Sequence, residues 1–120
     1  METGALDTDQ ATAYLVLGDK LGRGDDELGA LLMKNLLYAL ARSGSAPREV
    51  LFMNDGVKLA CAGSASIEDL ELLLEAGCVV RSCGTCLDFL GLKERLAVGE
   101  VGAMPDAVAM LQSGDAVVIG

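Results

Sequence analysis

The 120-residue sequence contains no histidine and no tryptophan, and only two phenylalanines and two tyrosines. Without histidine, the chain cannot form a Cys/His catalytic pair, a histidine proton shuttle or a mixed Cys/His metal site. With so few aromatic rings, it also lacks the stacking platforms on which single-stranded nucleic acids bind. These absences exclude Cys/His hydrolases and base-stacking proteins.

Basic residues are scarce too, with nine Lys and Arg against eighteen Asp and Glu, for a formal net charge of −9. Sequence-independent nucleic-acid binding depends on basic side chains that displace counterions from phosphates, so we do not expect it. Apolar runs such as residues 13–17 are far shorter than the roughly 18 residues that suggest a membrane span. The acidic start METGALDTDQ is also unlike a signal peptide. We therefore expect a soluble cytoplasmic protein with no membrane partner.

Apolar residues make up 52% of the chain, enough for one compact domain. We expect a flexible N-terminal arm over residues 1–11 and a single domain over residues 12–120. Short apolar runs predict strands, and periodic segments between them predict helices, the second with a capping box from Ser66 to Asp69. This alternation predicts an α/β fold in which helices cover both faces of a parallel sheet. The predicted strands are residues 12–17, 49–53, 78–82, 97–101 and 116–119, and the predicted helices are residues 25–42, 66–77 and 105–111.

The helix predicted at residues 25–42 is apolar almost all round, with Lys34 and Asn35 as the main interruptions. One face of a sheet would leave part of such a helix uncovered. We expect a homo-oligomer contact to cover it; the alternative is a deeply buried helix.

Two cysteines, Cys83 and Cys86, follow the third predicted strand in the segment RSCGTCLDFLG. A helical turn is expected from residue 85 to 90, ended by Gly91. Reactive groups collect at the carboxyl ends of parallel strands, and free N–H groups at the start of a helix favour thiolate over thiol. We therefore expect Cys83 to be ionised easily, and the Gly84-Thr85 turn to expose both sulfurs.

A CxxC pair also suits other chemistry. A structural zinc site would need Cys61 and Cys78 as further ligands, but Cys78 begins the strand that Cys83 ends, roughly 15 Å away at about 3.3 Å per residue. We expect neither a metal nor another cofactor. A dithiol oxidoreductase remains an alternative, although no proline is predicted beside the pair. For Cys61 and Cys78 we favour a third interpretation, inert burial in the core.

Three further residues lie at the same predicted sheet edge. The loop at residues 18–29 matches no phosphate-binding pattern, and its acids oppose an anion, but Arg23 within it is a candidate to hold a negatively charged sulfur species. Asn54 ends the second predicted strand. Lys58 is a candidate to lower the thiol pKa of Cys83 by proximity.

Three segments of the sequence resemble one family: LGRGDDELGALLMKNLL (21–37), LFMNDGVKLA (51–60) and SCGTCLDFLGLKERLAVGEV (82–101). They resemble the C-terminal domain of YedF-type proteins, regarded as sulfurtransferases, a branch of the DsrE/DsrF-like family. The resemblance covers roughly residues 12–119. It implies a three-layer α/β/α sandwich with a parallel five-stranded sheet, usually in homo-oligomers. It also implies that Cys83 carries sulfane sulfur as a persulfide and that Cys86 is the second cysteine of the motif.

These features lead to a sulfur-relay hypothesis. Cys83 would take sulfur from a donor protein or small sulfur species and pass it to an acceptor, while Cys86 resolves the persulfide or assists transfer. YedF-type proteins carry a TusA-like domain ahead of this one, so a TusA-like protein is a candidate partner. Two alternatives stay open: a non-catalytic oligomeric binding or regulatory module, and a CxxC dithiol oxidoreductase.

Overall fold

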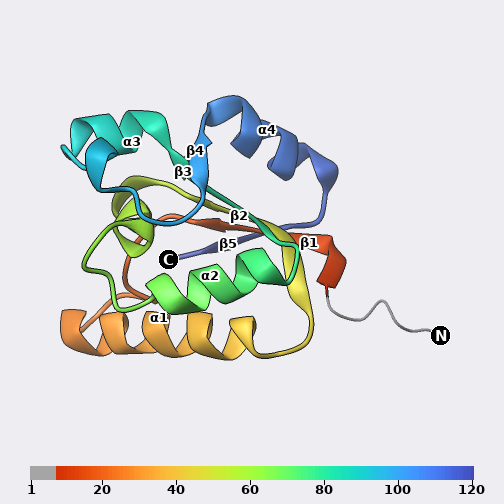
Figure 1. The fold of residues 1–120 in the computed structure, drawn as a ribbon, viewed down its shortest axis with the longest axis horizontal. Helices are drawn as coiled ribbons and strands as arrows, with labels where there is room; N and C mark the ends of the chain where they lie inside the picture. Colours follow the sequence, from red (N-terminus) through yellow and green to blue (C-terminus); the bar gives the residue numbers. More distant parts are fainter. Residues whose placement is uncertain (1–7) are drawn as a thin grey trace.

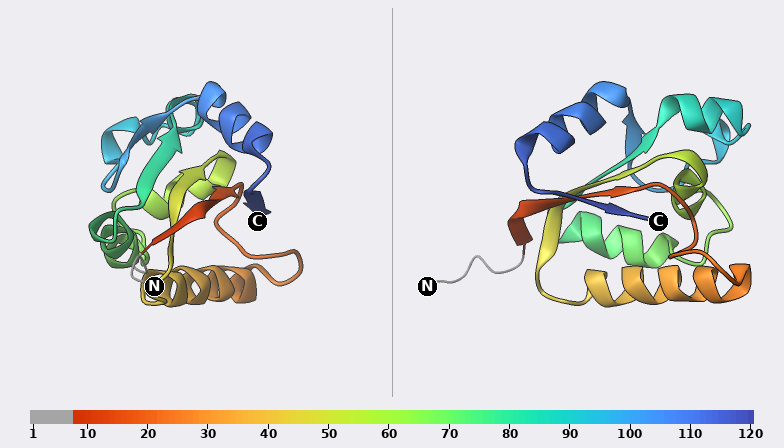
Figure 2. Two further views of the ribbon diagram at one scale, coloured as in Figure 1. Left: turned by 90° about the vertical axis from the view of Figure 1, so that its right-hand side faces the viewer. Right: turned by 180° about the vertical axis from the view of Figure 1, so that it is seen from behind.

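The computed structural model describes residues 8–120, with side chains from Thr12 onward, and has an all-parallel five-stranded sheet between two layers of helices (Figure 1). The strand order is β4-β3-β2-β1-β5. Helices α1 and α2 lie on one face of the sheet, and α3 and α4 lie on the other (Figure 2). The three-layer α/β fold is as predicted. Its strands are β1 (Thr8–Val16), β2 (Ala46–Phe52), β3 (Val79–Cys83), β4 (Glu100–Gly102) and β5 (Ala116–Ile119), its helices are α1 (Asp26–Ala41), α2 (Ile67–Glu75), α3 (Gly84–Phe89) and α4 (Met104–Ser113), and two 3₁₀ helices are η1 (Asn54–Ala60) and η2 (Lys93–Arg95).

The core forms around the inner strand β2, whose residues Leu51 and Phe52 are almost fully buried. Met33 and Leu37 of α1 and Leu70 of α2 are equally buried. A parallel strand that is covered on both faces requires a continuous apolar run, which is the pattern that predicted these strands. Burial of this apolar surface is the main stabilising contribution to the domain.

Helix α1 begins at the N-cap Asp25, whose carboxylate accepts a hydrogen bond from the N–H of Leu28 at 2.9 Å. Every fourth residue then faces the core, starting from Gly29. The opposite side leaves Leu31 and Tyr38 more than half exposed, at 56% and 51%. This confirms that one sheet face does not cover the helix, while the homo-oligomer contact stays a prediction. Over residues 8–120, no helix combines the length and apolar character that a membrane crossing requires.

Helices α1 and α2 are joined by an ion cluster that the sequence prediction missed. The Asp69 carboxylate, only 1% exposed, accepts hydrogen bonds from Lys34 Nζ at 2.6 Å and from an Arg42 guanidinium nitrogen at 2.8 Å. The predicted capping box is therefore wrong: Ser66 is the N-cap residue of α2, but in the described chain its side chain makes no capping hydrogen bond. Asp69 faces the two cations of α1 instead, because a buried carboxylate is stable only when its charge is paired.

The ends of β1 and β2 differ from the predicted ends. The sheet hydrogen bonds determine where these strands start, whereas the prediction relied on apolar residues. Strand β1 starts at Thr8, four residues before the predicted start, and most of the expected arm, residues 1–7, lies outside the described residues. Strand β2 begins at Ala46, three residues before the predicted start, and includes Pro47. Pairing of β2 with β3 begins only at Glu49, so Pro47 lies where β2 has β1 as its neighbour, an edge position that tolerates a missing N–H.

Strand β4 is shorter than predicted, starting at Glu100 instead of residue 97. The N–H groups of Ala97 and Val98 donate to the carbonyl of Ala60, at 2.9 and 3.2 Å, and so are bound to the end of η1 and not to the sheet. Gly99 has a left-handed φ of 81°, and this turn leads the chain into β4.

Candidate functional site

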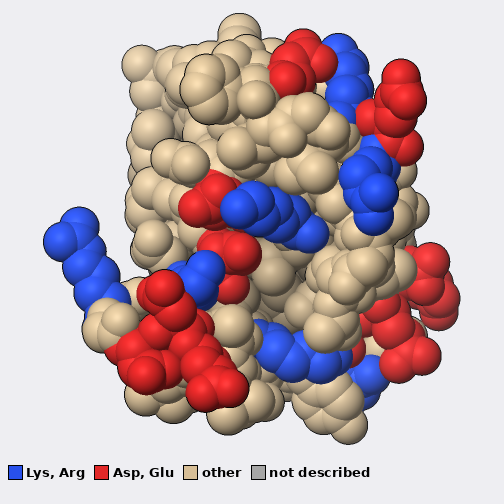
Figure 3. Space-filling model, turned by 90° about the vertical axis from the view of Figure 1, so that its left-hand side faces the viewer, with Lys and Arg blue, Asp and Glu red and all other residues tan. Residues whose placement is uncertain are grey.

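The two motif cysteines lie in a cavity of about 560 Å³ at the carboxyl edge of the sheet. Figure 3 faces this edge: its upper left part, on the side of α3 and α4, is free of charged side chains, while acidic and basic groups gather below and to the right. The cavity is lined by the polar or thiol residues Asn54, Cys83, Thr85 and Cys86 and by the apolar residues Leu17, Met53, Phe89, Leu90 and Met104. Segments far apart in the sequence thus form one site.

Cys83 is the last residue of β3 and the N-cap residue of α3, close to its predicted place between a strand ending at residue 82 and a helical turn beginning at residue 85. The expected exposure is wrong, because the residue is only 3% exposed. Within the described chain, its side chain also makes no capping hydrogen bond to the amides of α3, so the expected stabilisation of a thiolate by these donors is not found. Cys83 forms part of the wall of the cavity.

Cys86, one turn further along α3, is the more exposed cysteine of the pair. Its Sγ accepts a hydrogen bond from the backbone N–H of Asn54 at 3.1 Å. Asn54 has φ 53°, a left-handed conformation that Asn adopts more readily than most residues. Burial raises the pKa of the Cys86 thiol, the Asn54 N–H opposes this shift, and the hydrogen bond with Cys83 raises the pKa further. Cys86 therefore keeps its proton at neutral pH, beside a second free thiol.

The remaining candidate residues divide between the cavity and other places. Asn54 and Thr85 line the cavity. Gly84 packs against β4, where a Cβ would come within 2.9 Å of a methyl carbon of Val101. The structure does not bring Lys58 to the cysteines: its ammonium pairs with Asp55 at 3.1 Å. Arg23 lies exposed on the loop between β1 and α1 and is not among the residues that line the cavity.

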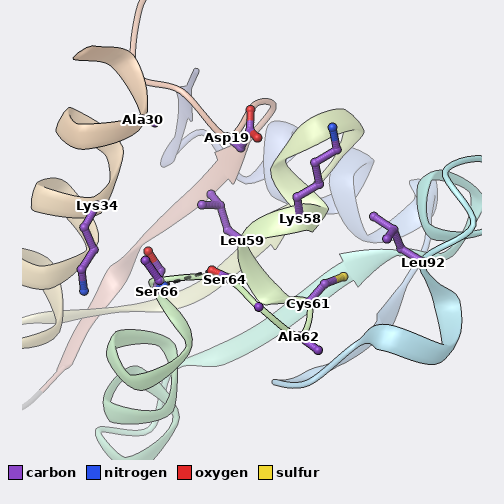
Figure 4. Close-up of a pocket in the computed structure, with 12 residues that line it drawn as sticks. Asp19, Ala30, Lys34, Lys58, Leu59, Cys61, Ala62, Ser64, Ser66 and Leu92 are labelled. Atoms are coloured by element: carbon purple, nitrogen blue, oxygen red, sulfur yellow. Dashed lines mark hydrogen bonds between the residues drawn. The ribbon is translucent and has the colours of Figure 1, made fainter. Parts of the chain in front are cut away.

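A second cavity of about 430 Å³ lies between α1, the end of η1 and the loop that precedes α2 (Figure 4). Lys58 and Cys61 both line it, but Figure 4 shows the Lys58 ammonium pointing away from the cysteine. The Cys61 thiol donates to the Val57 carbonyl at 3.2 Å, and burial raises its pKa. This cavity therefore holds no activated thiol.

Cys78 is also buried, and burial raises its pKa to about 12. Its thiol and that of Cys61 remain protonated in the core, which agrees with the predicted inert burial of both. In residues 8–120, no group of three or more Cys, Asp or Glu is arranged to hold a metal ion.

Sequence reasoning missed the apolar part of the site. Leu17 follows β1, Met53 follows β2, and Met104 begins α4. Phe89, at the end of α3, is 88% exposed, and Met104 is 59% exposed. The rule that ligands gather at the carboxyl ends of parallel strands could have found Leu17 and Met53, because each is the last residue of a predicted strand. Apolar side chains that remain exposed beside a cavity indicate a binding surface.

Comparison with known proteins identifies the fold. No family model and no curated protein sequence matches the chain. Among solved structures, the ychN protein from E. coli aligns with a TM-score of 0.63 at 20% identity, covering 90% of this chain and 97% of that one. The chain shares the fold of the ychN protein.

Two further structures of proteins of unknown function share this fold. MTH1491 from Methanobacterium thermoautotrophicum aligns with a TM-score of 0.62 at 21% identity, covering 92% of this chain and 98% of that chain. BT1422 from Bacteroides thetaiotaomicron aligns with a TM-score of 0.59 at 16% identity, covering 89% and 94%. The chain thus spans nearly the whole length of each neighbour, and the likeness concerns the fold.

Proposed function

We propose that this protein is a sulfur-relay protein of the YedF type, in which Cys83 carries sulfane sulfur as a persulfide. The single observation that supports the proposal is the shared cavity, where two free thiols from the end of β3 and the start of α3 lie together and one of them, that of Cys86, accepts a hydrogen bond from the Asn54 N–H. Thiol chemistry of this kind requires both sulfurs to be close to each other and within reach of a substrate.

The transfer step follows from the chemistry of thiols. The Cys83 thiolate attacks the outer sulfur of a donor persulfide: Cys83–S⁻ + R–S–SH → Cys83–S–SH + R–S⁻. One S–S bond forms, one breaks, and the departing thiolate R–S⁻ takes the electron pair. Cys86 lines the same cavity as Cys83, so its protonated thiol is placed to donate a hydrogen bond to that thiolate. Delivery to an acceptor thiolate is the same reaction in the opposite sense.

Intact-mass measurement after incubation with a sulfane-sulfur donor tests the proposal. Wild-type protein should gain the mass of one sulfur atom, and Cys83→Ser should abolish the gain. Cys86→Ser should load more slowly if the Cys86 thiol stabilises the departing thiolate. Cys61→Ala is the matched control, because Cys61 is buried and lies outside the cysteine cavity. Absence of added sulfur on wild type, or equal loading of Cys83→Ser, would refute the function.

The partners belong to the same proposal. Donor and acceptor are other proteins, a TusA-like protein among them, or small sulfur species. The protein itself acts as a homo-oligomer, and the exposed apolar side of α1, with Leu28, Leu31 and Tyr38, supports this. Sedimentation of wild type and of Leu31→Glu tests it: a wild-type protein that sediments as a monomer would refute the oligomer.

A further inference from the structure

The cysteine cavity is uncharged, and this limits what it can bind. Among the described residues that line it, none carries a formal charge, and five are apolar. Its volume of about 560 Å³ falls in the range of roughly 300 to 1,000 Å³ that is usual for small-molecule sites. An anionic group that enters such a cavity loses its water without gaining a cation, which is strongly unfavourable.

The candidate cation Lys58 and the backbone N–H of Asn54 are both engaged elsewhere. Lys58 is held by Asp55 at 3.1 Å and lines the second cavity. The backbone N–H of Asn54, a donor that could meet an anion, is bound to Cys86 Sγ at 3.1 Å. The protein as a whole carries a net charge of −9, which also opposes an anion.

The mouth of the cavity offers apolar contacts instead. Leu17, Phe89 and Met104 are 37%, 88% and 59% exposed, and each lines the cavity. Aromatic and thioether side chains of this kind gain free energy when an apolar body covers them. These three side chains bind a ligand without taking part in sulfur transfer, so the reactive groups of the site are the two thiols.

We infer that the sulfur compound handled by Cys83 and Cys86 is a small organic persulfide whose organic group R is uncharged and largely apolar. This inference rests on the proposed function and names the substrate class of the same site. It excludes thiosulfate and persulfides that bear carboxylates as the preferred donors. The bond changes are those of the transfer step above, with R seated against Phe89 and Met104.

Two donors that differ by one carboxylate provide the test. Benzyl persulfide and 4-carboxybenzyl persulfide share the reacting group. Loading of Cys83 by each donor is followed by intact mass. The assay is run at about 1 M salt, where the Debye length is about 3 Å, so that the net charge of the protein is screened. Benzyl persulfide should load on the order of tenfold faster or more. Equal or faster loading by the carboxylate would overturn the inference and leave the sulfur-relay function intact.

Variants on α4 locate the effect. Met104→Lys places a cation at the mouth and should reduce the preference for benzyl persulfide by about tenfold. Gln112→Lys makes the same change of charge on an exposed part of the same helix, outside the cavity, and should leave the preference unchanged. An equal effect of the two variants would show that the preference is not set by the cavity.

A second measurement separates this inference from the function. Alkylation of Cys83 and Cys86 by iodoacetamide and by iodoacetate requires no sulfur transfer, and the ratio of rates is compared with that of a small free thiol. The protein should favour the neutral reagent on the order of tenfold more than the free thiol does. If neither persulfide loads Cys83 but the protein still favours iodoacetamide more than the free thiol does, the sulfur-relay function is refuted and the preference for neutral ligands stands. If the ratio of the two alkylation rates equals that of the free thiol, the preference is overturned.

Discussion

Replacing Asp69 with asparagine removes the negative charge that joins α1 to α2 while keeping the size of the side chain. The carboxylate is 1% exposed and is hydrogen-bonded by Lys34 and Arg42. Breaking a buried ion pair typically costs about 3 to 5 kcal/mol. The two cations are 35% and 34% exposed and can be rehydrated, so we expect a lower cost of about 2 to 3 kcal/mol.

Urea unfolding followed by circular dichroism measures this cost, with all variants at one protein concentration. At a slope of about 1 to 3 kcal/mol per molar urea, the midpoint should fall by roughly 0.7 to 3 M. Glu68→Gln is the matched control, because Glu68 is 84% exposed and lies 4.0 Å from Arg42. It should change stability by less than about 0.5 kcal/mol. If Asp69→Asn were as stable as Glu68→Gln, the structural importance of the ion cluster would be refuted.

Three further predictions follow from single contacts. Burial alone would raise the pKa of Asp69, but its hydrogen bonds with Lys34 and Arg42 hold the pKa below 3.8. The ionised carboxylate therefore stabilises the fold above about pH 4. Urea midpoints should fall as the pH drops below that value. A Cβ at position 56 would lie 2.5 Å from the Val16 carbonyl oxygen, so Gly56→Ala should lower the urea midpoint, and an unchanged midpoint would contradict this contact. Because burial raises the pKa of Cys86 above 9.0, its rate of alkylation by iodoacetamide, measured by peptide mass, should still rise above about pH 9, whereas a plateau near pH 8.5 would be inconsistent with the buried thiol.

The elements that could be predicted are those whose signals lie within one stretch of sequence. The helix predicted at residues 25–42 agrees with α1 to within one residue at each end, because the capping acid and the apolar spacing are local. The final strand, Ala116–Ile119, agrees at both ends. The start of β1 at Thr8 could not be predicted, because the sheet hydrogen bonds that define it come from β2 and leave no apolar pattern in the sequence.

The place of the two cysteines in the fold could be predicted from the sequence, but their burial and hydrogen-bond partners could not. A CxxC pair after a predicted strand places Cys83 at a sheet edge. Its burial depends on packing against segments that lie far away in the sequence. The hydrogen bond from Asn54 to Cys86 likewise depends on the left-handed turn that follows β2. Lys58 was predicted to approach Cys83, but η1 directs it toward Asp55 and the second cavity.

The walls of the cysteine cavity come from the ends of β1 and β2, from α3 and from the start of α4, so Leu17 and Met104 meet there only when the whole chain has assembled. A chain in which α4 has detached would expose Cys83 and Cys86 to water and to any reagent, charged or neutral. The ratio of the alkylation rates by the neutral and the charged reagent therefore also reports whether α4 is packed in its native place. Mass spectrometry gives this ratio separately for each cysteine.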